Sequence, residues 1–186
     1  MMESDGSLLA RIRQGDDDAA DALLRRHFRS SYLVALARAG NPQDAEDICQ
    51  DAFIKCLGQI HTCREPDKFG AWLLQIVRNT AHNYMAYIGV RTSEPLTLHT
   101  QLTSSERSDA SIERHELRDA LLSALAQLSV DQREVVLLHD LEGFRHAEIA
   151  TQLEISILMA RRHLSDARKK LRSILGDYAT LELDHD

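Results

Sequence analysis

The spacing of apolar residues along the chain predicts a protein made of helices. Apolar positions recur every three or four residues through most of the sequence, and no convincing run alternates between apolar and polar residues as a half-buried strand does. We predict one helix over residues 17–39, a second that begins at Pro42 after an Asn41 cap, and a third that begins near Phe69. The apolar stripe of the second helix comprises Ile48, Cys49, Ala52, Phe53, Cys56, Leu57 and Ile60. The predicted fold class is therefore all-α.

Residues 89–110 interrupt the helical pattern. This segment, GVRTSEPLTLHTQLTSSERSDA, is dominated by Ser and Thr, contains Gly and Pro, and has little periodic apolar signal, which is typical of a flexible linker. It divides the chain into a first domain over residues 1–88 and a second over residues 111–176, with an acidic tail at 177–186. We predict two small helical domains joined by this linker.

The second domain contains the most informative pattern in the chain. Ser129 and Gln132 form a capping box that opens one helix, and Gly143 ends the turn after it. A helix over residues 145–153 follows, and Ser156 caps a final helix that ends in a basic cluster. This order describes a helix-turn-helix, whose last helix can lie in the major groove of DNA.

The charge of the chain is unusual for a DNA-binding protein, because the formal net charge is -7. However, basic residues are concentrated in one segment. Residues 161–175 contain six Lys and Arg side chains and one acidic side chain, Asp166. Such a cluster can be a solvated helix end, where cations are favourable. Its place on the last helix of the motif favours phosphate contacts instead.

Cys49, Cys56 and Cys63 are too few and too odd in number for a disulfide framework. The seven-residue spacing puts Cys49 and Cys56 on one helical face, where we interpret them as small core residues. A metal or redox site that also uses His61 and Cys63 stays as an alternative.

The sequence contains none of the common motifs for metal, phosphate or nucleophile chemistry, so we expect a protein that is not an enzyme and has no cofactor or metal. No apolar run approaches the roughly 18 residues of a membrane span. The first residues also lack an apolar stretch of signal-peptide length. We therefore expect a cytoplasmic protein with no membrane insertion of its own.

Three blocks of the chain resemble bacterial extracytoplasmic-function (ECF) sigma factors of the sigma-70 family. DAEDICQDAFIKCL is similar to the helix of that family that binds core RNA polymerase, and FGAWLLQIVRNTAHNYM to the helix that recognises and melts the minus-10 element. LSVDQREVVLLHDLEGFRHAEIATQLEIS with RRHLSDARKKL resembles the fourth sigma domain, which reads the minus-35 element. The resemblance covers nearly the whole chain in the expected order. It implies an alternative sigma factor that binds core polymerase and promoter DNA under the control of an anti-sigma factor.

The resemblance also implies three sets of site residues. Contacts with core polymerase are expected from Asp44, Asp47, Gln50 and Asp51. Contacts with minus-10 DNA are expected from Arg78, Asn79, Thr80 and Asn83. Contacts with minus-35 DNA are expected from Ser156, Arg161, Arg162, His163, Arg168 and Lys169.

Two further assignments concern the loop before the minus-10 helix and the first turn of that helix. Residues 61–68 correspond to the loop of the family that accepts a flipped base. Trp72 could stack on such a base, but it falls on the apolar stripe with Phe69 and Ile76, so we predict a core residue.

The final helix departs from the family pattern. It begins Ser156-Ile157-Leu158-Met159-Ala160, where the family usually has proline, a small apolar residue, glycine, threonine and valine, and Asp166 replaces a common basic residue. A second hypothesis is therefore a sigma-factor mimic that sequesters an anti-sigma factor without directing transcription. A third is a stand-alone helix-turn-helix repressor, which the repulsive field of the acidic first domain disfavours.

Overall fold

Helices make up most of the chain in the computed structural model, which describes residues 3–91 and 109–179 and, within them, the side chains of 3–88 and 117–176. The elements are α1 (Asp5–Ile12), α2 (Asp17–Ala39), α3 (Pro42–Gly58), the short 3-10 turns η1 (Ile60–Thr62) and η2 (Pro66–Lys68), α4 (Phe69–Arg91), α5 (Asp109–Ala126), α6 (Val130–Val136), the π-helical turn η3 (Leu137–Leu141), α7 (His146–Leu153) and α8 (Ile157–Ala179). No strand occurs among these described residues, so the predicted all-α class is confirmed.

The middle of the predicted linker, residues 92–108, lies outside the described residues, as does most of the predicted tail, residues 180–186. Both ends of the predicted linker are helical, because α4 runs to Arg91 and α5 begins at Asp109. The last helix, α8, likewise covers the first residues of the predicted tail.

The helix starts that the sequence predicts are present and are fixed by side-chain caps. Asn41 Oδ1 accepts a hydrogen bond from the backbone N–H of Asp44 at 2.9 Å, with Pro42 in the first turn of α3. Ser129 and Gln132 form the predicted capping box at α6. At the start of α8, Ser156 Oγ accepts from the N–H of Met159 at 3.1 Å. These caps satisfy backbone donors that have no partner inside the helix.

One helix was not predicted. The helix α1 is only eight residues long, and Ser4 caps it by accepting from the N–H of Ser7. Leu8 and Leu9 are buried, and the helix packs against α2. So short a helix forms mainly because tertiary packing stabilises it, which the apolar pattern of the segment alone does not reveal.

In the predicted first domain α2, α3 and α4 pack around one core, and most of the stripe predicted on α3 is buried, but Phe53 is only half-buried. Leu57 is 41% exposed, so its assignment to the core was wrong. In the second domain, the packing of α7 against α8 buries the apolar residues between them, which are Ile149, Leu153, Ala160 and Leu164.

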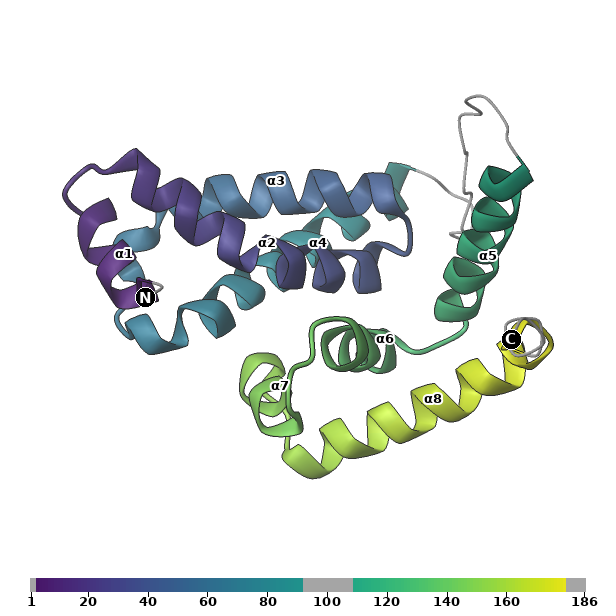
Figure 1. The fold of residues 1–186 in the computed structure, drawn as a ribbon. Helices are drawn as coiled ribbons and strands as arrows, with labels where there is room; N and C mark the ends of the chain where they lie inside the picture. The colour runs from purple at the N-terminus through teal and green to yellow at the C-terminus, as the bar shows by residue number, and fades with distance from the viewer. Residues whose placement is uncertain (1–2, 92–108, 180–186) are drawn as a thin grey trace.

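The two predicted domains contact each other. Figure 1 shows α6 and α7 lying beneath α2 and α4, with α8 along the outer edge of the second domain. The helix α2 packs on α6 and η3, and α4 packs on α7. The helix α5 lies beside α8. This arrangement, which we call the closed form, decides which predicted site residues face solvent.

Candidate polymerase and nucleic-acid interfaces

The outer side of α3 carries the residues predicted to contact polymerase. Asp47, Gln50 and Asp51 are exposed, and we call these three residues the acidic face. Asp44 is half-buried, and its carboxylate forms hydrogen bonds within the domain. It accepts hydrogen bonds from Asn41 Nδ2 at 2.6 Å and from the Tyr84 hydroxyl at 2.9 Å. Asp44 therefore ties α3 to α4, while Asp47 and Asp51 supply the charge of the face.

Tyr84 reaches across from α4 to this part of α3. Its hydroxyl donates to Asp44 and lies 3.4 Å from Asp47 Oδ2. Burial and the neighbouring carboxylates both raise the pKa of Tyr84, because each disfavours a phenolate there. The tyrosine therefore remains a proton donor that holds the two helices together.

An apolar groove beside the acidic face was not predicted. Phe28, Tyr32 and Phe53 line a hollow of about 390 Å³ that Gln50 also borders. The Phe28 ring stacks on Tyr32 at a centroid distance of 6.2 Å and is 49% exposed. The signal was present in the sequence, because Leu24, Phe28 and Tyr32 recur every four residues and so share one helical face.

The predicted minus-10 residues of α4 do not share one environment. Asn79 and Asn83 are exposed and lie four residues apart, so they share one side of the helix. Thr80 is only 3% exposed, and its hydroxyl accepts a hydrogen bond from Lys55 Nζ at 3.3 Å. Its prediction as a direct DNA contact is wrong, because a buried hydroxyl that is already hydrogen-bonded cannot reach a base. Arg78 points into the contact between the domains.

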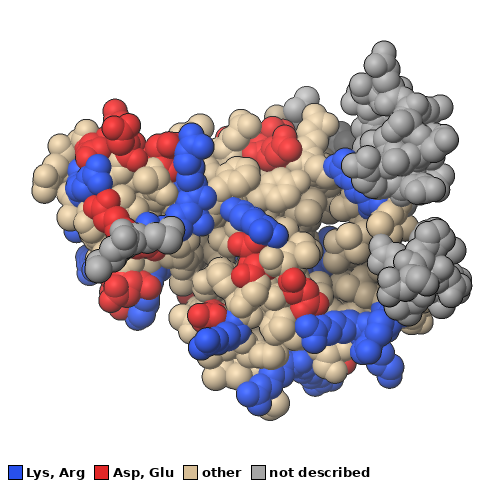
Figure 2. Space-filling model, viewed as in Figure 1, with Lys and Arg blue, Asp and Glu red and all other residues tan. Residues whose placement is uncertain are grey.

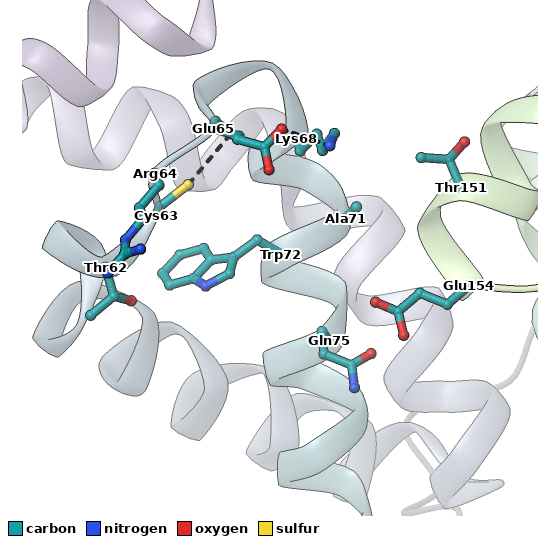
Figure 3. Close-up of a pocket in the computed structure, with 10 residues that line it drawn as sticks. All are labelled: Thr62, Cys63, Arg64, Glu65, Lys68, Ala71, Trp72, Gln75, Thr151 and Glu154. Atoms are coloured by element: carbon teal, nitrogen blue, oxygen red, sulfur yellow. Dashed lines mark hydrogen bonds and ion pairs between the residues drawn. The ribbon is translucent and has the colours of Figure 1, made fainter.

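A hollow of about 490 Å³ lies between the loop before α4 and the second domain. Figure 3 shows the Trp72 ring and the Gln75 amide on one side, and Thr151 of α7 and Glu154, which follows that helix, on the other. Trp72 packs against Phe69 at a ring distance of 5.7 Å, as a core residue should, yet it also lines the hollow. The buried Oε1 of Gln75 has no hydrogen-bond partner within the described part of the chain.

The contact between the domains centres on Glu134 of α6, whose side chain is fully buried. Its Oε1 accepts a hydrogen bond from Arg38 Nε of α2 at 2.6 Å. Its Oε2 lies 3.6 Å from Arg78 Nη2 of α4. Arg78 also donates from Nη1 to the carbonyl of Leu153 at 3.1 Å. One carboxylate of the second domain thus binds two arginines of the first.

A second, more exposed ion pair supports this contact. Arg29 Nε lies 2.6 Å from Glu142 Oε1, and Arg29 Nη2 donates to the carbonyl of Leu141 at 3.1 Å. The Arg29 side chain is 68% exposed, so water screens its pair more strongly than it screens Glu134.

The outer side of α8 is mostly basic, and Figure 2 shows Lys and Arg side chains along the lower edge of the molecule, where Figure 1 places this helix. Arg161, Arg162 and Lys169 are exposed, and His163 is half-buried. The exposed Ser156 uses its hydroxyl to cap the helix.

Arg168, another predicted minus-35 contact, is already engaged within the domain. Its Nε donates to Asp140 Oδ2 at 3.1 Å. The hydrogen bond from Arg168 lowers the pKa of Asp140, so the pair remains charged at neutral pH. Arg168 therefore joins α8 to η3, and it is less available to DNA than Arg161 or Lys169.

The three cysteines are buried and free, as expected of core residues. Within the described residues, no group of three or more His, Cys, Asp or Glu side chains is arranged to hold a metal ion. None of the helices in that part of the chain is both long and apolar enough to cross a membrane.

The cysteine environments predict unreactive thiols. Burial raises the pKa of Cys49 and of Cys56 to about 12. At neutral pH the thiolate, which is the reactive form, is then on the order of 10⁻⁵ of each. We expect native protein to react very slowly with Ellman's reagent at these positions, and guanidinium-unfolded protein to react rapidly at all three cysteines. Rapid reaction of Cys49 or Cys56 in the folded protein would contradict this environment.

Two sequence families match the chain in the order of its domains. Sigma-70 region 2 matches residues 23–87, and sigma-70 region 4 matches residues 118–171. RNA polymerase sigma factor CarQ of Myxococcus xanthus is 31% identical over 181 residues, which cover 95% of this chain and 98% of CarQ. The ECF RNA polymerase sigma-E factor of Haemophilus influenzae is 26% identical over 179 residues, which cover 91% of this chain and 94% of that protein.

The solved structure of CnrH in complex with the cytosolic domain of CnrY has the same fold. It matches with a TM-score of 0.67 at 24% identity, over 94% of this chain and 99% of that chain. The two sequence families and the solved structure match the same helical chain over most of its length. The chain therefore belongs to the sigma-70 family and, within it, to the ECF sigma factors of RNA polymerase.

Proposed function

We propose that this chain is an alternative sigma factor that binds core RNA polymerase and directs promoter recognition, DNA melting and transcription initiation. The observation that carries the proposal is the separation of charge: the acidic face lies on α3 of the first domain, and the basic side of α8 lies on the second. Sigma factors are not enzymes, so the protein supplies specificity and polymerase supplies the chemistry.

The polymerase contact is proposed for the acidic face and the groove beside it. Asp47 and Asp51 present negative charge to a basic partner, and Gln50 joins them to the aromatic groove. Exposed aromatic side chains are enriched in protein interfaces because they bury a large area on binding. We therefore extend the predicted contact from α3 to Phe28 and Tyr32 of α2.

The minus-10 contact is proposed for α4 and the loop before it. The exposed amides of Asn79 and Asn83 can hydrogen-bond base edges of a separated strand. Beside them, Trp72 offers an aromatic surface for stacking, and Gln75, which lines the same hollow, carries an amide that can hydrogen-bond a base once the hollow is open. These features suit the capture of a flipped base.

The minus-35 contact is proposed for α8. Arg161, Arg162 and Lys169 are exposed and can bind phosphates or guanine edges. Asp166 would repel a nearby phosphate, and it lies 3.7 Å from Arg162 Nε. Polymerase bound to the first domain would supply much of the affinity that this mixed surface lacks.

The closed form covers part of this machinery. Arg78 is bound to Glu134 and to the Leu153 carbonyl, and α7 forms one wall of the hollow beside Trp72. A DNA strand cannot occupy these positions while α7 does. We therefore propose that the closed form is the free protein, and that the domains separate when polymerase binds.

We also propose that an anti-sigma factor controls the chain, since a solved structure of the same fold is the sigma factor RpoE in complex with the anti-sigma factor NepR from Bartonella quintana. The predicted division into residues 1–88 and 111–176, joined by 89–110 and followed by the tail 177–186, suits a partner that holds two domains at once. A protein that acts with RNA polymerase works in the cytoplasm, and we propose that location.

Run-off transcription with purified core polymerase on genomic fragments tests the main proposal. The wild-type chain is expected to start transcripts at defined promoters. The Arg161→Gln/Arg162→Gln variant is expected to bind core polymerase normally. From promoters with a minus-35 element, its transcript yield should fall by at least roughly tenfold. Failure of the wild-type chain to bind core polymerase would refute the proposal.

Two binding assays, run beside the transcription assay, separate the two alternative hypotheses. A chain that binds an anti-sigma factor tightly but starts no promoter-dependent transcript would be a mimic. A chain that binds an operator strongly without polymerase would be a stand-alone repressor, which its formal net charge of -7 disfavours.

A further inference from the structure

The first turn of α8 is apolar and exposed. Ile157 is 46% exposed, Leu158 is 76% exposed and Met159 is 39% exposed. Leu158 has the largest exposed fraction among the exposed large apolar side chains of the described residues. Water-facing leucine on an otherwise charged helix suggests a surface that is covered in the working complex.

Leu158 lies on the same side of α8 as the exposed basic side chains. Ala160, Leu164 and Ala167 are buried and mark the inner side of the helix. At 3.6 residues per turn, Leu158 and the exposed Arg162 and Lys169 fall on the opposite side, since they are separated by four and seven residues. The Ser156 cap fixes where the helix begins, so this side chain has a defined place at its tip.

The charges around Leu158 indicate what covers it. Arg161 and Arg162 stand one turn away and are exposed, so the surrounding surface suits a polyanion rather than an apolar protein partner. The first residues of a recognition helix contact base edges in the major groove. In that groove the C5-methyl group of thymine is the apolar feature that a leucine can contact.

Not every basic side chain of α8 is free to contact DNA bases. Arg168 is held by Asp140, and Arg162 lies within 3.7 Å of Asp166. An apolar contact at the helix tip would add to the base discrimination that the exposed Arg161 and Arg162 can supply. We propose that Leu158 determines specificity in the minus-35 element by contacting a thymine methyl group. This inference rests on the proposed function of α8.

The test uses holoenzyme made from core polymerase and the full chain. Transcripts are sequenced from a promoter library in which the minus-35 region is randomised. The wild-type chain is expected to enrich thymine at one or two minus-35 positions, and Leu158→Ala is expected to lose that enrichment. Alanine is a good helix former at an exposed site, so the variant should fold normally.

A chemical probe then isolates the methyl group. Deoxyuridine lacks only that group, so placing it at the enriched position should weaken wild-type promoter binding roughly fourfold, the effect of one buried methyl-sized group. The same replacement should have no effect on Leu158→Ala holoenzyme, because the contact is already absent. A deoxyuridine effect that persists undiminished in Leu158→Ala would overturn the inference.

Ile157→Ala is the matched control. It removes a neighbouring, 46% exposed apolar side chain that points about 100° away around the helix. This variant should retain the thymine preference and the deoxyuridine effect. If the wild-type chain starts no promoter, the proposed function fails. If it starts promoters but shows no thymine preference that depends on Leu158, only this inference fails.

Discussion

Glu134→Ala is expected to separate the two domains in the free protein. The substitution removes the carboxylate that binds Arg38 and Arg78, and both arginines then remain poorly solvated at the contact. Removing one partner of a buried charge group typically costs several kcal/mol, so we expect the closed form to lose about 2–4 kcal/mol. Small-angle X-ray scattering should show a larger radius of gyration, with unchanged helix content by circular dichroism.

Two variants make this result specific. Glu134→Gln keeps an oxygen acceptor for Arg38 and should open the protein less than alanine does. Asp21→Ala removes an exposed ion pair with Arg25 inside α2 and should leave the scattering unchanged. If Glu134→Ala scatters like the wild type, the closed form does not depend on this carboxylate.

The pH dependence of closure has a definite sign. Burial is the largest influence on Glu134, and it raises the pKa of that carboxyl above its ordinary value of 4.5 despite the two arginines. The closed form therefore binds the proton more tightly than the open form, in which the carboxyl is solvated. Lowering the pH through the raised pKa should strengthen closure, and Glu134→Gln should abolish this dependence.

Asp47→Lys/Asp51→Lys is expected to abolish productive binding to core polymerase. Both side chains are exposed on α3, and neither forms an ion pair within the described residues. Asp47 is 3.4 Å from the Tyr84 hydroxyl, but Asp44 accepts from that hydroxyl at 2.9 Å, so the substitution should keep the packing of α3 on α4. Reversing two interfacial charges replaces attraction with repulsion, and we expect binding at least roughly 30-fold weaker. Native gel shift or fluorescence anisotropy with labelled protein measures the change.

The control for this variant is Asp17→Lys/Asp18→Lys. These two aspartates are also exposed, but they lie in the first turn of α2, away from the acidic face. The control makes the same change in net charge, so it should retain polymerase binding. Equal loss in both variants would indicate a general charge effect, and the assignment of α3 as the polymerase contact would then be withdrawn.

The sequence predicted those features that depend on neighbours along the chain. The caps at Asn41, Ser129 and Ser156 are local, because each side chain bonds to a backbone group three residues away. The buried stripe of α3 is also local, since helical periodicity alone places it. The wrong assignment of Leu57 to the core concerns a residue at the edge of that stripe, next to the buried Cys56.

The sequence could not predict features that depend on how distant segments pack. Arg38 and Glu134 are 96 residues apart, and nothing in either segment marks them as partners. The burial of Thr80 and the use of Arg78 between domains follow from the same packing. The site residues were therefore assigned correctly to helices, but their accessibility came only from the structure.

The Tyr84 hydroxyl has a consequence for how promoter opening is positioned. It fastens α4 to α3 through Asp44, and the two helices share a common core, so they move as one body. On the proposed function, one of these helices holds polymerase and the other holds the separated strand. The distance between the polymerase contact and the separated strand is then fixed inside the first domain. That distance sets the point at which the duplex opens, independently of the length of the segment between the domains.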